Sequence, residues 1–120
     1  MKRRAAYPAV PASSADFTRI AGSAATADVL PEIADAVGDR VKILVDGGIR
    51  SGTDIFRALA LGADAVMICR PFLISYYGGG TEGIVTYVEK LRAELTDAMY
   101  MCGARSLGDI TRDMVREIRM

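Results

Sequence analysis

Six residues in two short groups provide the side chains and backbone that this sequence could use for chemistry. They are Asp46, Gly47, Gly48 and Arg50 after one apolar run, and Cys69 and Arg70 after the next. An arginine guanidinium binds pairs of oxygen atoms in a fork geometry, and a glycine lets a ligand approach the backbone more closely than any residue with a Cβ. The residue types therefore predict that the two groups together bind an anion, and a phosphomonoester suits them best.

A helix that starts directly after the first group is expected to add to this attraction. Ser51 or Thr53 can cap it, and Asp54 stands three residues after Ser51, as in a capping box. The first N–H groups of a helix carry partial positive charge. We therefore expect these N–H groups to face the phosphate.

Plainer interpretations of the same residues stay open. Residues 46–50 could form only a tight turn with a surface arginine, and Arg70 could be an ordinary salt-bridge residue. The carboxylate of Asp46 would repel a phosphate, so its expected part is to accept hydrogen bonds from ligand hydroxyl groups or to hold an arginine. The sequence contains no histidine, which removes the commonest general base and metal ligand. No catalytic residue and no metal site are therefore predicted.

A strand, a helix and a second strand must position the two groups. A continuous apolar run predicts a strand over Val41 to Val45 that is buried on both faces. A helix is expected from about Thr53 to Leu61, ended by Gly62, and a second strand from Ala65 to Cys69. With joints this short the two strands are parallel, with a right-handed crossover, so both polar groups lie at the same edge of the sheet.

Helical spacing of apolar residues predicts three further helices. They run from Thr26 to Val37, from Gly83 or Ile84 to Cys102, and from Leu107 to Ile118. Pro31 falls inside the first pattern, so that helix either begins near Leu30 or is bent at its start. Met99, Met101 and Cys102 on the second could hold a soft metal, but methionine at helical spacing is usually core filler.

The segment Tyr76 to Gly83, YYGGGTEG, leads from the second strand into the longest of these helices. Arg70 and Pro71 are expected to end the strand, because proline cannot donate to the ladder. Three consecutive glycines could cradle a phosphate, but the segment lacks the lysine of a P-loop. A flexible joint is therefore the favoured interpretation.

Composition and charge argue against several classes of protein. The chain has 15 acidic and 15 basic residues, so no nucleic-acid surface is indicated, and its basic cluster, Lys2 to Arg4, is interpreted as a solvated tail and not a membrane contact. No apolar run reaches about 18 residues and no apolar signal core is present, so we expect no membrane span and predict the cytoplasm as compartment. Cys69 and Cys102 lack metal-ligand and disulfide spacing and are expected to be buried, reduced thiols.

The composition of the chain changes at about residue 23. Residues 1–23 are rich in Ala, Ser and Pro and are expected to form a poorly ordered arm or a degenerate strand, since Pro8 and Pro11 allow only a short strand at a sheet edge. Residues 24–120 are expected to form the α/β domain. This length is well short of the ~250 residues of a complete eight-stranded α/β barrel.

Two long segments carry a resemblance to a known family. They are VKILVDGGIRSGTDIFRALALGADAVMICRPF and YYGGGTEGIVTYVEKLRAELTDAMYMCGARSLGDITRDM. The chain resembles the C-terminal part of the FMN-dependent 2-hydroxy acid oxidases and dehydrogenases, the lactate and glycolate oxidase group, over about Thr26 to Val115. The resemblance implies a partial (β/α)8 TIM barrel made of its last two βα units and flanking helices. It also implies FMN as cofactor, with its ribityl chain and phosphate at Asp46, Gly48 and Arg50, and its phosphate also at Arg70.

The chain departs from this family in several places. The family usually has glycine where Cys69 stands. Its His-Gly-Gly-Arg motif corresponds here to Ala15, Asp16, Phe17 and Thr18. The histidine that would take the proton of the substrate hydroxyl and the arginine that would pair with the substrate carboxylate are therefore absent, and Arg19 could substitute only if the strand slipped. The first five strands of the barrel are not part of this sequence.

Three functional hypotheses follow. The first is a truncated relative of these oxidoreductases that holds FMN or another phosphate compound and does no hydroxy acid chemistry alone. The second is an active FMN-dependent 2-hydroxy acid oxidoreductase assembled with a partner chain, and the third is a ligand-free structural or interaction module. Two parallel strands with open edges and one uncovered face also predict self-association, as a dimer or larger homo-oligomer that completes or covers the partial barrel.

Overall fold

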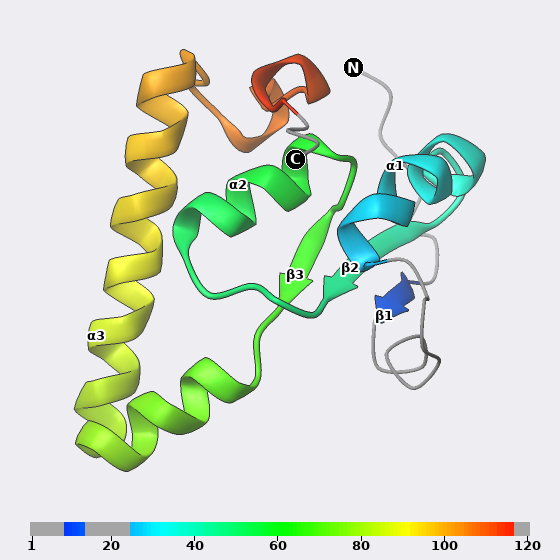
Figure 1. Cartoon of the computed structure of the whole chain (residues 1–120). Coiled ribbons are helices and arrows are strands. Elements are labelled where there is room, and N and C mark those ends of the chain that lie inside the picture. Colours follow the sequence, from blue (N-terminus) through cyan, green and yellow to red (C-terminus); the bar gives the residue numbers. More distant parts are fainter. Residues whose placement is uncertain (1–8, 14–24, 117–120) are drawn as a thin grey trace.

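The computed structural model describes residues 9–13 and 25–116 of the chain. Its elements, in chain order, are β1 (Ala9–Ser13), α1 (Thr26–Val37), β2 (Lys42–Asp46), α2 (Gly52–Ala60), β3 (Ala65–Met67), α3 (Arg70–Cys102) and the 3-10 turns η1 (Leu107–Asp109) and η2 (Arg112–Met114). Helices α1 and α2 both pack on the face of the sheet that bears Ile43 and Val45, and Figure 1 shows α2 between the sheet and α3. The architecture is a partial α/β unit.

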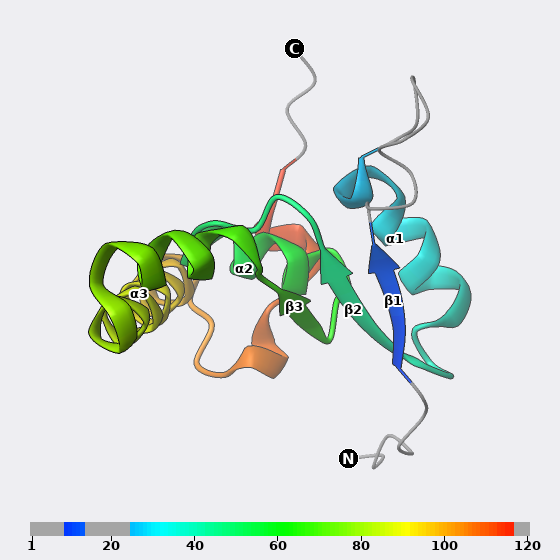
Figure 2. The same cartoon turned by 90° about the horizontal axis from the view of Figure 1, so that it is seen from below.

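The three strands form one parallel sheet in the order β1-β2-β3, and they lie side by side in Figure 2. Asp46 at the end of β2 pairs with Met67 at the end of β3, which confirms the predicted parallel βαβ unit. β1 adds a third strand with Ser13 opposite Asp46. This strand is short, contains Pro11 and lies at an edge, as expected for a proline-bearing strand, whereas the remainder of the predicted arm lies outside the described residues.

The central strand β2 is buried on one face only, so the prediction of burial on both faces is wrong. Ile43 and Val45 point into a core that also contains Leu30 of α1 and Ala58 of α2. Leu44, on the opposite face, is half-buried, because no element in the described part of the chain covers that side. A continuous apolar run is typical of a strand in a complete barrel, and this chain supplies only part of the cover.

Helix α1 has the bounds that its apolar spacing predicts, with Gly38 as its C-cap. Pro31 lies inside the helix and not in its first turn, so the alternative of a start near Leu30 is wrong.

Arg112 anchors the C-terminal segment on this helix through Asp35, with N···O distances of 3.0 and 3.2 Å, and donates to the Pro31 carbonyl at 3.5 Å.

The turn from α2 into β3 is held by a glycine and an aspartate. Gly62 has φ +115°, and a Cβ built on it would lie 2.5 Å from the Cβ of Ala34 on α1. Asp64 accepts hydrogen bonds from the Lys42 ammonium at 2.8 Å and from the Ile43 N–H at 3.0 Å. The start of β3 is therefore tied directly to the start of β2.

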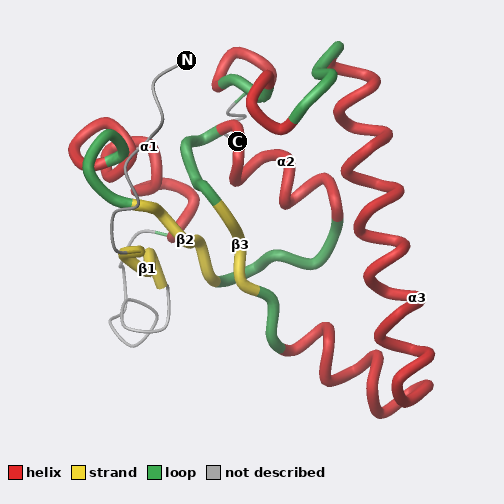
Figure 3. Tube along the Cα trace, turned by 180° about the vertical axis from the view of Figure 1, so that it is seen from behind, coloured by secondary structure: helices red, strands yellow, loops and turns green. Residues whose placement is uncertain are grey.

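Helix α3 differs from the prediction at its beginning. It starts at Arg70, with Pro71 in its first turn, and Gly80 breaks it into two segments with φ 59° and ψ −142°. Figure 3 shows the short first segment turning into the long second one. The predicted joint over Tyr76 to Gly83 is thus mostly helical, and the break falls on one residue, because only Gly80 of the three glycines takes a positive φ.

The segment after α3 forms two short turns where a helix over Leu107 to Ile118 was predicted. Ser106 and Asp109 form a capping box, but η1 ends after three residues. Its apolar residues serve a different purpose: Ile110 joins Phe56, Ala60 and Ala104 in a second core cluster. Packing over the end of α2 thus prevails over helical periodicity, and Ile118 lies outside the described residues.

None of the helices in the described part of the chain is both long and apolar enough to cross a membrane. Both cysteines lie within the described residues, and both are exposed free thiols. The prediction that Cys69 and Cys102 are buried is therefore wrong, since each lies at an end of α3 where no other element packs over it.

Replacing Gly62 with Ala should lower the free energy of unfolding by roughly 2–4 kcal/mol, because the new Cβ meets both a positive φ and the side chain of Ala34. Urea denaturation followed by circular dichroism measures this. Gly78→Ala is the matched control, since nothing lies within 4 Å of a Cβ there and a helical alanine is favourable. Equal stability of the two variants would contradict the packing argument.

Candidate functional site

The pairing of β2 with β3 brings the two predicted groups of residues to one edge of the sheet. Because Asp46 is opposite Met67, Gly47 to Arg50 and Ile68 to Arg70 leave the sheet at the same level. Figure 1 shows both segments at the arrowhead end of the strands. Ligands of parallel α/β sheets bind at this edge.

Gly47 and Gly48 make the turn that follows β2. Their φ angles are 106° and 76°, so both use the left-handed conformation that the sequence predicts for them. A Cβ built on Gly48 would have no atom within 4 Å. The backbone at Gly48 is therefore open to a ligand on the side where other residues carry a side chain.

The arginine that follows this turn has a fixed backbone and an exposed side chain. The Arg50 N–H donates to Asp54 Oδ2 at 3.1 Å, and its carbonyl accepts from the Tyr87 hydroxyl at 2.8 Å. Within the described residues, the guanidinium makes no hydrogen bond or ion pair. The charge of Arg50 is thus presented to solvent from an anchored main chain.

The second arginine begins a helix, whereas the sequence predicted it at the end of a strand. β3 stops at Met67, and Arg70 is the first residue of α3, followed by Pro71 in the first turn, where proline is favoured. Arg70 is exposed and, in the part of the chain that the structure describes, forms no ion pair. Two exposed guanidinium groups therefore follow neighbouring strands.

Cys69 and Asp46 complete the predicted set. Cys69 has φ −118° and ψ −77°, and because this φ is negative the position does not require the glycine that the family usually has. Asp46 is half-buried at the end of β2. The binding roles of all six residues stay predictions.

The N-terminus of α2 does not offer the open N–H groups that were expected to face a phosphate. Ser51 and Asp54 form a capping box, and Asp54 Oδ2 also accepts from the N–H groups of Arg50 and Ser51. The Gly52 N–H donates to the Glu94 carboxylate at 2.7 Å. The chain's own carboxylates thus occupy this helix end, so the two arginines and the Gly48 turn are the groups left for an anion.

Glu94 is held in this position by its neighbours on α3 and α2. Lys90, one turn earlier, pairs with it at 2.6 Å. The hydrogen bond from Lys90, together with the one from the Gly52 N–H, holds the pKa of Glu94 below its usual value. The same Lys90–Glu94 hydrogen bond raises the pKa of Lys90. Sequence reasoning missed Glu94, because the partner that it caps is 42 residues away.

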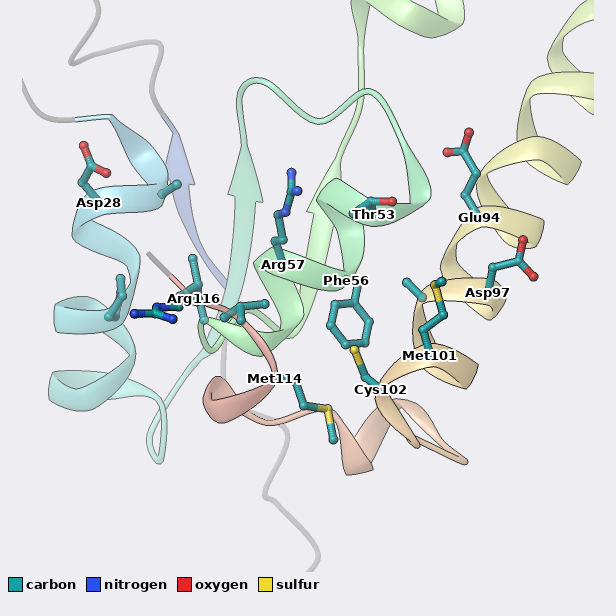
Figure 4. A pocket seen from close by; sticks show the side chains of 15 residues that line it. Asp28, Thr53, Phe56, Arg57, Glu94, Asp97, Met101, Cys102, Met114 and Arg116 are labelled. Carbon is teal, nitrogen blue, oxygen red and sulfur yellow. The ribbon is translucent and has the colours of Figure 1, made fainter. Parts of the chain in front are cut away.

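A separate groove of about 990 Å³ lies along α2, and its lining includes neither arginine of the predicted site. Figure 4 shows Thr53 and Arg57 of α2 between Asp28 of α1 and Glu94 and Asp97 of α3. Charges of both signs surround an apolar floor that includes Phe56. Among the described residues, no group of three or more His, Cys, Asp or Glu side chains could hold a metal ion.

Comparison with known proteins is consistent with this arrangement. A model of the FMN-dependent dehydrogenases matches residues 18–117. The peroxisomal (S)-2-hydroxy-acid oxidase GLO4 of Oryza sativa subsp. japonica is 50% identical over 91 residues, which are 76% of this chain and 25% of that protein. L-lactate dehydrogenase of Pseudomonas putida is 47% identical over 98 residues, 81% of this chain and 26% of that protein.

Solved structures resemble the chain in the same way. A mandelate oxidase variant with an FMN adduct superposes with a TM-score of 0.80 at 36% identity, over 87% of this chain and 33% of that one. The chain spans about a quarter of the length of the curated relatives that it matches.

The lowered pKa of Glu94 predicts a change in acid stability. A carboxyl whose pKa is lower in the folded state stabilises the fold above its unfolded pKa of about 4.3, and this contribution is lost as the pH falls through the folded value. Glu94→Gln should therefore lose less stability than the wild type between about pH 5 and pH 3. Thermal unfolding of both proteins between about pH 5 and pH 3 measures the loss of stability. Glu89→Gln, on the same helix, is the control for removing one charge. Parallel curves for wild type and Glu94→Gln would refute the linkage.

Proposed function

The chain belongs to the family of FMN-dependent dehydrogenases, and we propose that its sheet edge binds the phosphate end of FMN. FMN is the cofactor that the resemblance assigns to this chain. The observation that carries the proposal is the placement of Arg50 and Arg70 after two paired strands, beside Gly48, at which a Cβ would have no atom within 4 Å. A phosphate dianion needs such charge-assisted donors.

Each residue has a distinct part in the proposed site. The guanidinium groups of Arg50 and Arg70 bind phosphate oxygens, and the turn at Gly47 and Gly48, whose backbone is open at Gly48, lets the ligand approach closely. Asp46 accepts hydrogen bonds from ribityl hydroxyls, while Cys69 lines the same edge. Bound FMN would supply the redox-active ring, and none of these six residues is assigned a part in the redox chemistry.

We infer that this 120-residue chain alone does no 2-hydroxy acid oxidation. The sequence contains no histidine, so it cannot supply the proton acceptor that the family resemblance implies. The positions that correspond to the family's His-Gly-Gly-Arg motif, Ala15 to Thr18, lie outside the described residues. A truncated relative that keeps the phosphate-binding segment is the function that these observations support best.

The second candidate function is an active oxidoreductase formed with a partner chain, and the uncovered face of the sheet favours it. Leu44 is half-buried, and Met67 on the same face is 45% exposed. The outer edges of β1 and β3 have no strand partner within the described part of the chain. Apolar sheet faces and open edges favour association, so we propose that these surfaces are covered in an assembly. Copies of this chain would form a homo-oligomer without histidine, whereas the active oxidoreductase needs a different chain that brings the missing strands and a histidine.

Two further points remain part of the proposal. The cytoplasm is still a prediction for this chain, and the rice relative is a peroxisomal oxidase. A ligand-free interaction module is the third candidate. Binding of a phosphate compound to the exposed Arg50 and Arg70 would argue against it.

Substituting either arginine should weaken FMN binding. Arg50→Ala and Arg70→Ala each remove charge-assisted hydrogen bonds, so we expect about a tenfold or larger rise in Kd for FMN in each. The affinity for riboflavin, which has no phosphate, should stay the same. Titration followed by quenching of flavin fluorescence measures both ligands.

The matched control is Arg92→Ala, because Arg92 is exposed on α3 and lies outside the proposed site. It should bind FMN as the wild type does. An unchanged FMN affinity in both Arg50→Ala and Arg70→Ala would show that the phosphate assignment is wrong.

Activity and assembly should separate the first two functions. The isolated chain is expected to elute as a dimer or larger species in size-exclusion chromatography, because its sheet face is uncovered, and to leave L-lactate and glycolate unoxidised after loading with FMN. Absorbance at flavin wavelengths across the elution profile reports binding and assembly together. Turnover of either substrate would reject the inactive assignment, and a monomer would reject self-association.

A further inference from the structure

Tyr87, in the second segment of α3, contacts both arginine-bearing segments. Its hydroxyl donates a hydrogen bond to the Arg50 carbonyl at 2.8 Å. Its ring packs edge-to-face on the ring of Phe72, with centroids 5.2 Å apart and an interplanar angle of 80°. Phe72 follows Arg70 by two residues, so one side chain touches the segment after β2 and the segment after β3.

These contacts matter because the sheet register fixes the two segments only as far as Asp46 and Met67. Beyond those residues the glycine turn carries the chain to Arg50, and glycine restrains the backbone least of all residues. The Tyr87 hydrogen bond anchors the far end of that turn. The ring pair holds the first turn of α3, where Arg70 lies, at a set distance from the same tyrosine.

The hydroxyl is suited to act as a permanent donor. Tyr87 is half-buried, and burial raises its pKa above the usual value, with nearby Glu94 and Asp54 adding to the rise and Lys90 opposing it. The phenol therefore stays protonated at neutral pH. Its hydrogen bond to a carbonyl, which can only accept, is retained over the whole physiological range.

We propose that Tyr87 is a positioning residue that sets the separation of Arg50 and Arg70 for a phosphate ligand. It acts through the Arg50 carbonyl and the Phe72 ring, not by contact with the ligand. The proposal rests on the proposed function, since it assumes that both arginines bind one phosphate. Charged donors must match the oxygen positions closely to act together, so a small change in their separation weakens binding without unfolding the chain.

The test compares Tyr87→Phe, which keeps the ring on Phe72 and removes the hydroxyl, with Tyr87→Leu, which removes both contacts. We expect Tyr87→Phe to raise the Kd for FMN roughly 3- to 10-fold and Tyr87→Leu to raise it further. Riboflavin affinity should be unchanged in Tyr87→Phe. Tyr100→Phe is the matched control, since Tyr100 lies on the same helix and is 79% exposed.

Two further measurements separate positioning from a general structural role. In the Arg50→Ala background, Tyr87→Phe should have a smaller effect on FMN affinity than in the wild type, because the group that it places is gone. Hydrogen exchange of the FMN-free chain should show faster exchange at the amides of residues 48–51 in Tyr87→Phe, and not in Tyr100→Phe.

The outcomes are distinct for this proposal and for the proposed function. If wild type binds FMN and Tyr87→Phe binds it equally well, or loses FMN and riboflavin affinity in equal proportion, the positioning role is wrong while the phosphate site stands. If wild type binds no FMN, the proposed function fails. Wild-type binding with a selective loss for FMN in Tyr87→Phe supports both.

Discussion

The parallel pairing of β2 with β3 is the constraint on which the rest of this structure depends. Asp64 fixes it at the start of the strands, where its carboxylate binds both the Lys42 ammonium and the Ile43 N–H. The strands then run in register to Asp46 and Met67. Every residue of the candidate site follows one of these two strand ends, so a shift in register would separate the two arginines and would turn Ile43 and Val45 away from the core.

Electrostatics at the N-terminus of α2 explains which positively charged groups are left to attract an anionic ligand. A helix N-terminus attracts anions, and this chain satisfies its own with the carboxylates of Asp54 and Glu94. The same contact locks α3 against α2: a Cβ on Gly52 would overlap the backbone of Leu91 and Leu95. The N-terminus of α2 thus serves the packing of α3, and the exposed guanidinium groups of Arg50 and Arg70 are the ones left for the phosphate that we propose.

The uncovered face of the sheet is best understood by comparing the chain with its longer relatives. The chain matches about a quarter of the rice oxidase and about a third of the solved mandelate oxidase variant with an FMN adduct. The matched part includes the sheet edge that we propose to bind the FMN phosphate, and the helices on one face of the sheet. The other face, with Leu44 and Met67, has the apolar character of an interior without the elements that would enclose it.

The sequence by itself determined the features that depend on neighbours in the chain. Helix α1, the Ser51–Asp54 capping box, the positive φ of Gly47 and Gly48 and the parallel βαβ unit were all predictable, because caps, turn residues and apolar spacing act within a few residues. The helical start of α3 at Arg70 and the short turns after Ser106 were not, because packing decided them against the local pattern. Only the tertiary structure decided which groups touch the site: Tyr87 reaches Arg50 across 37 residues and Glu94 reaches Gly52 across 42, and no local rule encodes contacts at that separation.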